Sequence, residues 1–255
     1  MRHWFVSLAV VFAAAGVAAA DEKAEAIVKK GIEAHGGADN LNKYKAAKFT
    51  MKGDLSVLGM NLDFTGDIAY SLPDRFRLNM TMDVMGMKMV IHQVVKGDKV
   101  KNSVKVGDTV VPADSDKEKE ELKAAAAFQE AEQLTPLLDP KKFEIKAADD
   151  EDVDGKKAAV IVAKAKAVDK EMKICFDKTT GLIVKTAHKG LGPGEGGQPA
   201  EVYEESYPSE YKKVNGLQMP TKVVINHDGK KFMTMTASDI EILEKLDDKE
   251  FTVDD

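Results

Sequence analysis

The spacing of hydrophobic residues changes along the chain, and each change predicts a different element. An almost unbroken apolar run extends from Phe5 to Val17. Between Ala24 and His35, apolar residues recur every three or four positions among lysines and glutamates, which predicts an amphipathic helix. Gly36-Gly37 is expected to end this helix, because glycine adopts the left-handed backbone conformation of a helix C-terminus without strain. A second helical turn is expected over residues 38–44.

From Lys48 onward the spacing becomes two, which predicts β-strands with one apolar face. Glycines and Pro73-Asp74 interrupt the alternating runs at close and even intervals, as turns between short strands do. The apolar positions of these runs are Phe49, Met51, Leu62, Phe64, Phe76, Leu78, Met80, Met82, Met87, Met89 and Ile91. Short strands at such spacing predict an antiparallel meander that curls into a sandwich or barrel, and hence a β-rich α+β fold.

A helix is predicted to interrupt the sheet at residues 116–134, where Lys, Glu, Ala and Leu dominate and Pro136 follows. One face of modest width is expected to carry Leu122, Ala125, Ala126, Phe128 and Gln129. Further strands are expected at 143–147, 158–163, 171–176, 182–188, 202–207, 218–226 and 231–241. Turns are predicted at 177–181 and 227–230, and a glycine- and proline-rich loop at 190–199.

The first apolar run reads as a cleavable signal peptide over residues 1–20. Arg2 precedes the run, and small residues at 18–20 precede Asp21, so cleavage is expected after Ala20. A retained N-terminal anchor is the alternative, but the run is short for a bilayer span and leads directly into charged sequence. The chain is therefore expected to act in the periplasm or outside the cell. Residues 21–255 are expected to form one domain, although their length alone would also allow two small ones.

The charge balance excludes some partners. The chain has 37 basic and 43 acidic residues and a formal net charge of −6. Without a basic stripe to displace counterions, nucleic-acid binding is not expected, and anionic membrane surfaces are disfavoured.

Candidate chemistry is sparse, and we assign no catalytic residue, metal site or cofactor. Cys175 lies between Ile174 and Phe176 and is expected to be a small buried hydrophobe, since nothing near it would activate a nucleophile. The acidic run at 149–154 is interpreted as a solvated turn rather than a calcium loop. An enzyme stays an alternative only if His92, His188 and a carboxylate converge in one pocket.

Methionine is unusually frequent in the first group of predicted strands. Met51, Met60, Met80, Met82, Met85, Met87 and Met89 fall within one stretch. Methionine is unbranched and polarizable, so it fits irregular apolar partners, whereas a rigid core favours Leu, Ile and Val. Two interpretations stay open: ordinary core filling, or an adaptable apolar cavity on the concave face of the sheet. Burying a ~16-carbon acyl chain in such a cavity would gain on the order of 10 kcal/mol before ordering costs.

Several motifs together resemble the LolA/LolB-like periplasmic lipoprotein carriers and their exported relatives. The motifs cover most of the chain after residue 20 in the order found in that family. They are Ala34-His35-Gly36-Gly37-Ala38-Asp39-Asn40-Leu41, Pro73-Asp74-Arg75-Phe76-Arg77, Asp177-Lys178-Thr179-Thr180-Gly181-Leu182, Tyr211 to Pro220, and Leu246 to Phe251.

The resemblance implies an incomplete antiparallel barrel with an N-terminal helix, in which segment 116–134 closes the mouth as a lid. It implies a monomeric periplasmic protein that binds lipid or lipoprotein acyl chains. Phe76 matches the family's aromatic residue, but Leu72 stands where the carriers have an arginine that latches the lid. The resemblance therefore implies the fold, while the polar latch associated with lipoprotein transfer is missing. A sensor or interaction module that binds envelope membrane proteins is the alternative.

Overall fold

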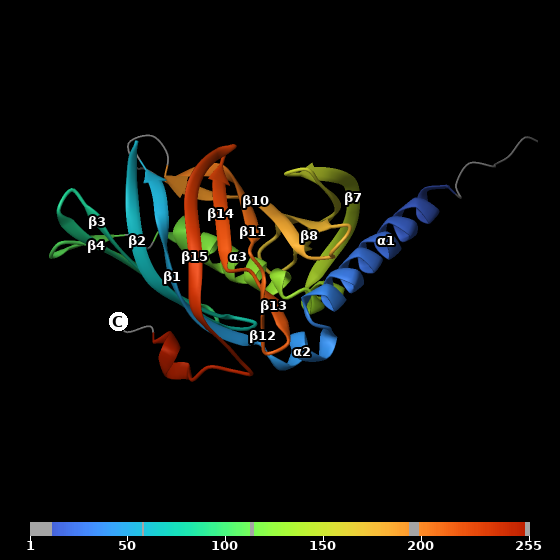
Figure 1. The fold of residues 1–255 in the computed structure, drawn as a ribbon, viewed down its shortest axis with the longest axis horizontal. Helices are drawn as coiled ribbons and strands as arrows, with labels where there is room; N and C mark the ends of the chain where they lie inside the picture. Colours follow the sequence, from blue (N-terminus) through green and yellow to red (C-terminus); the bar gives the residue numbers. More distant parts are fainter. Residues whose placement is uncertain (1–11, 58, 113–114, 194–198, 253–255) are drawn as a thin grey trace, which may run out of the picture.

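One antiparallel sheet of 13 strands organises the computed structural model, which describes residues 12–57, 59–112, 115–193 and 199–252 (Figure 1). The strands of its first half are β1 (Ala46–Val57), β2 (Met60–Ser71), β3 (Arg75–Val84), β4 (Met87–Lys96), β5 (Lys99–Val106) and β6 (Thr109–Pro112). Those of its second half are β7 (Phe143–Val153), β8 (Lys156–Ala165), β9 (Lys170–Asp177), β10 (Ile183–Pro193), β11 (Pro199–Ser209), β14 (Lys222–His227) and β15 (Lys230–Leu243). A separate small hairpin joins β12 (Lys212–Val214) to β13 (Leu217–Met219).

The two halves of the sheet meet at the pair of β1 and β15. The strand order is β6-β5-β4-β3-β2-β1-β15-β14-β11-β10-β9-β8-β7, so each half is a meander and the last long strand joins them. β6 and β7 form the two edges and do not pair with each other, which leaves the curled sheet open. This arrangement confirms the predicted β-rich α+β fold with an incomplete barrel.

Strand register places the alternating apolar residues of the first half on the concave face. Met51 lies opposite Gly66, which in turn lies opposite Met80. A Cβ atom at Gly66 would come within 2.9 Å of the Met51 methyl carbon and 2.1 Å of a backbone oxygen. Glycine at this position therefore lets the methionine side chain lie flat against the sheet, where strand neighbours are about 5 Å apart.

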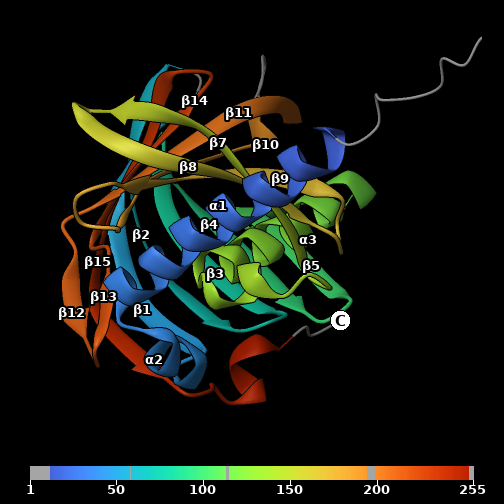
Figure 2. The same ribbon diagram turned by 90° about the vertical axis from the view of Figure 1, so that its right-hand side faces the viewer.

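Two long helices pack against the same concave face (Figure 2). The helices are α1 (Phe12–His35), the short α2 (Ala38–Lys43), and α3 (Asp116–Glu132), which is followed by the 3₁₀ turn η1 (Thr135–Leu138). Val28 of α1 and Phe128 of α3 share one buried cluster with Ile161 and Ile174 of the sheet. The side chains of both helices thus form the core together with β8 and β9.

A capping box begins the mid-chain helix α3. The Ser115 hydroxyl accepts a hydrogen bond from the Glu118 backbone N–H at 3.3 Å, and the Glu118 carboxylate accepts one from the Ser115 N–H at 3.0 Å. This reciprocal pair satisfies two N–H groups that the helix itself leaves unbonded. The helix predicted at 116–134 is confirmed, with its end two residues earlier.

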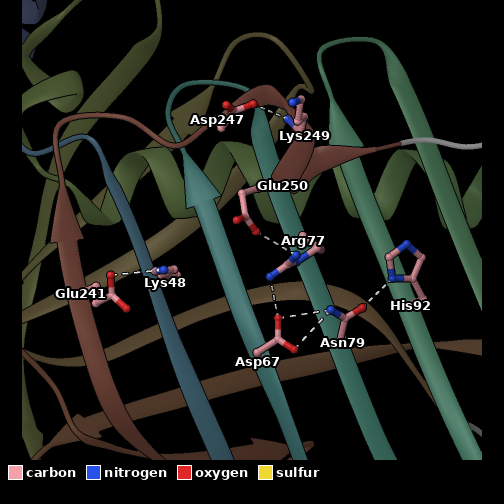
Figure 3. A network of polar contacts seen from close by, with 9 residues as sticks. All are labelled: Lys48, Asp67, Arg77, Asn79, His92, Glu241, Asp247, Lys249 and Glu250. Carbon is pink, nitrogen blue, oxygen red and sulfur yellow. Dashed lines mark hydrogen bonds and ion pairs between the residues drawn. The ribbon is translucent and has the colours of Figure 1, made fainter.

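The C-terminal segment covers part of the opposite, convex face. There η3 (Asp248–Phe251) inserts Phe251, which is fully buried against Ala46, Ala69 and Val94. Figure 3 shows the polar contacts beside it: Arg77 donates to Asp67 at 2.7 Å and to Glu250 at 3.0 Å. The turn η3 is therefore attached to the convex side of β2 and β3, on the face opposite the helices.

Three local predictions differ from the structure. Strands β5 and β6 were not predicted: lysine and asparagine occupy half of the positions of β5, which pairs with β4, and β6 has only four residues and pairs with β5. The loop predicted at 190–199 is wrong at both ends, since β10 continues to Pro193 and β11 begins at Pro199. Residues 218–226 form two short strands in different sheets rather than one.

The helix expected from Ala24 begins earlier, at Phe12. Much of the predicted signal peptide, residues 1–11, lies outside the described residues, and cleavage after Ala20 stays a prediction. Within the part of the chain that the structure describes, no helix combines the length and the apolarity that a membrane crossing requires.

Candidate ligand-binding site

A cavity of about 250 Å³ lies where α3 crosses the junction of the two half-sheets. Both halves contribute to its wall: β1 and β2 from one side, and β11, β14 and β15 from the other. Its apolar lining consists of Leu41, Phe49, Ile68, Ile183, Pro208, Leu217, Met219, Pro220, Val223, Ile225, Met235, Ala237 and Ile240. Its polar lining consists of His35, Tyr70, Gln129, Glu132, Gln133, Ser206, Tyr211 and Gln218. An apolar hollow with a few polar groups is the usual form of a small-ligand site.

The C-terminal end of α3 supplies the polar end of the cavity. Glu132 Oε1 lies 3.5 Å from the Thr186 hydroxyl of β10, at the limit of a hydrogen bond. Burial, together with the charge of nearby Glu204, raises the pKa of Glu132 to about 7. A carboxyl group that changes protonation near neutral pH therefore faces this site.

Gln133 and Tyr70 form a buried pair beside this carboxyl group. The Gln133 side-chain amide donates to the Tyr70 hydroxyl at 3.2 Å, and burial raises the pKa of Tyr70 to about 12. Gln133 is 9% exposed, and its Oε1 atom is buried without a hydrogen-bond partner. Such an unpaired polar atom costs roughly 1–3 kcal/mol, so a ligand that pairs with it would recover stability.

A second polar contact closes the side of the cavity nearest α1. The Tyr211 hydroxyl donates to the Ile183 carbonyl at 2.9 Å, and its ring meets His35 edge-on at a centroid distance of 5.9 Å. His35 Nδ1 lies 2.8 Å from the Gly31 carbonyl, and burial lowers the pKa of His35. These rings act as a neutral, hydrogen-bonded wall at neutral pH.

The predicted binding residues fall into three groups. Met51, Leu62, Phe64, Met80 and Met82 are 2–9% exposed and form one buried cluster, here called the methionine cluster. Leu78, Met89 and Ile91 pack against that cluster, whereas Phe49 lines the cavity itself. Phe76 packs instead with Val95, Leu122 and Ala126, and Met87 is 52% exposed at the start of β4.

The cavity and the methionine cluster are neighbours on the concave face. Ile68 and Met235 line the cavity and also pack against the cluster. The cluster itself is filled by its own side chains, which agrees with core packing in the present conformation. Its role in ligand binding stays a prediction.

A larger hollow of about 620 Å³ lies between the first turns of α3 and strands β9 and β10. Charged residues of both signs line it, and Lys170 pairs with Glu121 across it at 2.7 Å. Its lining is therefore unsuited to an acyl chain, although it is the more voluminous of the two.

Two histidines lie on the concave face close to this charged hollow. His188 lies 4.6 Å from the Phe128 ring centroid, and burial lowers its pKa. His227 Nε2 is 3.1 Å from Glu204 Oε2, and its ring stacks on Phe232. A Cβ atom at Gly192 would meet the His227 ring at 2.9 Å, which explains glycine within this strand.

The convergence that would indicate an enzyme does not occur. His92 hydrogen-bonds Asn79 at 2.6 Å on the convex face, beside Asp67 and Arg77 (Figure 3), whereas His188 faces α3. Within the described ranges, no three His, Cys, Asp or Glu side chains are grouped to hold a metal ion. Cys175 is fully buried, which confirms that prediction, and burial raises its pKa to about 11.

The two arginines that follow Leu72 contact the turn η3 rather than the helix α3. Arg75 pairs with Asp248, and Arg77 with Glu250. Leu72 lines a separate small hollow with Gln133 and Glu130 of α3. Leu72 therefore places an apolar side chain in a hollow whose other lining residues are mostly polar or charged.

Sequence reasoning missed Glu132 and Gln133. Glu132 follows Phe128 by four positions and so lies on the buried side of the helix, where an acidic residue is exceptional. An acidic residue on that side of the helix could therefore have indicated a polar site from the sequence alone. The expected apolar face was also rotated, since Ala124 is buried and Ala125 is exposed.

The arrangement defines a class of protein: an open antiparallel barrel whose concave face is covered by two helices. No protein-family model matches the sequence, and no curated protein matches it. Solved structures do. A DUF1329 family protein from Desulfovibrio piger is 13% identical, with a TM-score of 0.51 over 91% of this chain and 98% of that chain.

Two further similar structures are described as a lipoprotein-sorting protein domain and a LolA superfamily protein, in line with the family that the motifs resemble. A putative outer membrane lipoprotein-sorting protein domain from Vibrio parahaemolyticus is 13% identical, with a TM-score of 0.50 over 91% of this chain and 97% of that one. A LolA superfamily protein from Nitrosomonas europaea is 10% identical, with a TM-score of 0.51 over 90% and 97%. The chain thus has the fold of LolA superfamily structures over most of its length.

Proposed function

We propose that this protein binds and carries acyl chains of lipids or lipoproteins in the cell envelope. The observation that carries the proposal is the apolar cavity beneath α3, which both half-sheets line. The LolA-like fold and the predicted signal peptide support it, and on this proposal the protein acts in the periplasm. On this proposal the protein is a carrier and not an enzyme.

The cavity must expand to accept a long chain. Its 250 Å³ lies just below the roughly 300–1,000 Å³ of typical small-ligand pockets. The neighbouring methionine cluster offers the room, because methionine side chains change rotamer with little cost. The chain would enter beside Phe49 and Ile68 and displace methionine side chains farther along the sheet.

A cavity-filling variant tests the proposal. Ala237 lies opposite Met51 on the concave face and lines the cavity, whereas adjacent Thr236 is exposed on the other face. Ala237→Phe should weaken binding of a fluorescent fatty-acid probe about tenfold or more, because the ring occupies the ligand volume. Thr236→Phe adds the same bulk outside and should bind as the wild type does.

Native mass spectrometry of the protein purified from its own envelope, followed by lipid extraction, identifies the cargo. A lipid or acylated peptide near one-to-one occupancy supports the carrier. A ligand-free mass together with no acyl-probe binding would contradict it and favour the alternative, a module that binds an envelope protein through its rim with a filled core.

A further inference from the structure

The polar end of the cavity carries an acid without a basic partner. Among the described residues that line the cavity, Glu132 is the sole carboxylic acid, and no lysine or arginine is present. Its one polar contact is the distant Thr186 hydroxyl at 3.5 Å. An ionised Glu132 would therefore face the cavity with its charge uncompensated, which is unfavourable for a half-buried carboxylate.

The titratable groups around Glu132 do not neutralise it. Glu204 of β11 repels it and is itself paired with His227 at 3.1 Å. Tyr70 of β2 and Tyr211, which follows β11, are buried phenols whose pKa values the charge of Glu132 further raises. His35 of α1 is kept neutral by burial. Each surrounding element thus presents a neutral or an acidic group to this carboxyl.

The adjacent Gln133 provides an independent observation. Its side chain is more than nine-tenths buried, lines the same cavity, and keeps its oxygen without a partner. Two neighbouring side chains at the end of α3 therefore offer unfilled hydrogen-bond acceptors. The ligand group that matches both is a donor with positive charge.

We propose that Glu132 and Gln133 bind the ammonium group of an amphiphile whose tail lies along Phe49, Ile68 and Val223. This inference rests on the proposed function and names the head group of its ligand. An anionic head would meet Glu132 without a countercharge, so carboxylate or phosphate amphiphiles should bind more weakly. A neutral alcohol should fall between the two.

Competition of twelve-carbon ligands against the fluorescent probe separates these cases. At pH 8 dodecylamine should displace the probe at a concentration at least about tenfold lower than dodecanoate, with dodecanol between them. Glu132→Gln should weaken dodecylamine about tenfold and leave dodecanol nearly unchanged, because it removes the charge and keeps the shape. Glu120→Gln removes one negative charge from an exposed position on the same helix. It should change neither the affinity for dodecylamine nor that for dodecanol.

A second measurement needs no variant. Alkyl amines, like lysine, stay protonated up to about pH 10, whereas burial raises the pKa of Glu132 to about 7. Wild-type affinity for dodecylamine should therefore rise several-fold between pH 6 and pH 8, while that for dodecanol stays flat. Equal affinities for the three ligands, or an unaltered amine affinity in Glu132→Gln, would overturn the inference.

The outcomes distinguish the two proposals. If all three ligands bind alike and Ala237→Phe blocks them, the carrier holds and the amine preference fails; if none binds, the carrier itself fails. The ammonium group could come from an aminolipid or from a lipidated peptide with a free amino terminus. Lysophosphatidylethanolamine and a diacylated lipopeptide, the latter with and without N-acetylation, tell these sources apart.

Discussion

At the scale of single residues, polar side chains that are shielded from water have shifted pKa values and make stability depend on pH. Glu132 is the clearest case, because burial and Glu204 raise its pKa from 4.5 to about 7. The folded protein therefore binds a proton that the unfolded chain has released between these two pH values. Stability must fall as the pH rises through this window, since the native state holds more protons there.

Replacement of Glu132 by Gln should remove this pH dependence. We expect the free energy of unfolding of Glu132→Gln to be about 2 kcal/mol higher than that of the wild type at pH 8. At pH 4.5 we expect no such difference. Urea unfolding of both proteins at the two pH values measures the difference. Glu120→Gln serves as the exposed control; a gain independent of pH would contradict a buried, titrating Glu132.

At the scale of elements, the C-terminal turn η3 packs against the convex face and attaches the C-terminal segment to the sheet. Phe251 is fully buried against Ala46, Ala69 and Val94, and Arg75 and Arg77 pair with acidic residues of the same turn. The ion pairs are partly exposed and contribute little alone. The aromatic ring should therefore carry most of the attachment.

Phe251→Ala should lower the free energy of unfolding by about 3 kcal/mol, because it leaves a cavity beneath η3. Phe251→Leu, which keeps most of the volume, should cost less than half of that. Chemical denaturation measures both. Because η3 lies on the face opposite the cavity, both variants should bind the acyl probe as the wild type does under conditions where they are folded. A loss of binding would show that the two faces are coupled.

At the scale of the whole molecule, the open sheet places a cavity beside a cluster that can rearrange. Ile68 and Met235 belong to both regions, so a ligand that fills the cavity touches the methionine cluster next. Leucine has a similar volume but fewer rotatable bonds than methionine. The cluster's composition should therefore influence long ligands more than short ones.

Replacing Met51, Met80 and Met82 together by Leu should cost at most about 1.5 kcal/mol per position in stability. We expect the triple variant to bind a 16-carbon chain several-fold more weakly while an 8-carbon chain binds almost as before. Isothermal titration of the two chain lengths measures this ratio. Met85 and Met87, which are 83% and 52% exposed, provide the control pair for Leu substitution. Equal losses for both chain lengths would argue against an adaptable cluster.

The sequence alone was sufficient for the features that depend on neighbours along the chain. The alternation of apolar and polar residues with a period of two predicted β2 to β4 and put Met51 and Met80 on the same face of the sheet. Helical spacing of apolar residues, followed by Pro136, predicted α3. Turn chemistry located the hairpin at 177–181, where the Asp177 carboxylate accepts the Thr179 N–H at 2.7 Å. These signals work because strand faces, helix faces and turns are set by local backbone geometry.

Tertiary structure decided which surfaces meet. The pairing of β1 with β15 joins residues almost 200 positions apart, and no local pattern encodes it. That pairing brings Phe49 of β1 and Val223 of β14 into the wall of one cavity, which Glu132 at the end of α3 also lines. The methionines were visible in the sequence, but whether they line a cavity or fill a core depends on how tightly the sheet curls. Curvature results from the packing of all strands and both helices, so it becomes defined only when the chain is folded.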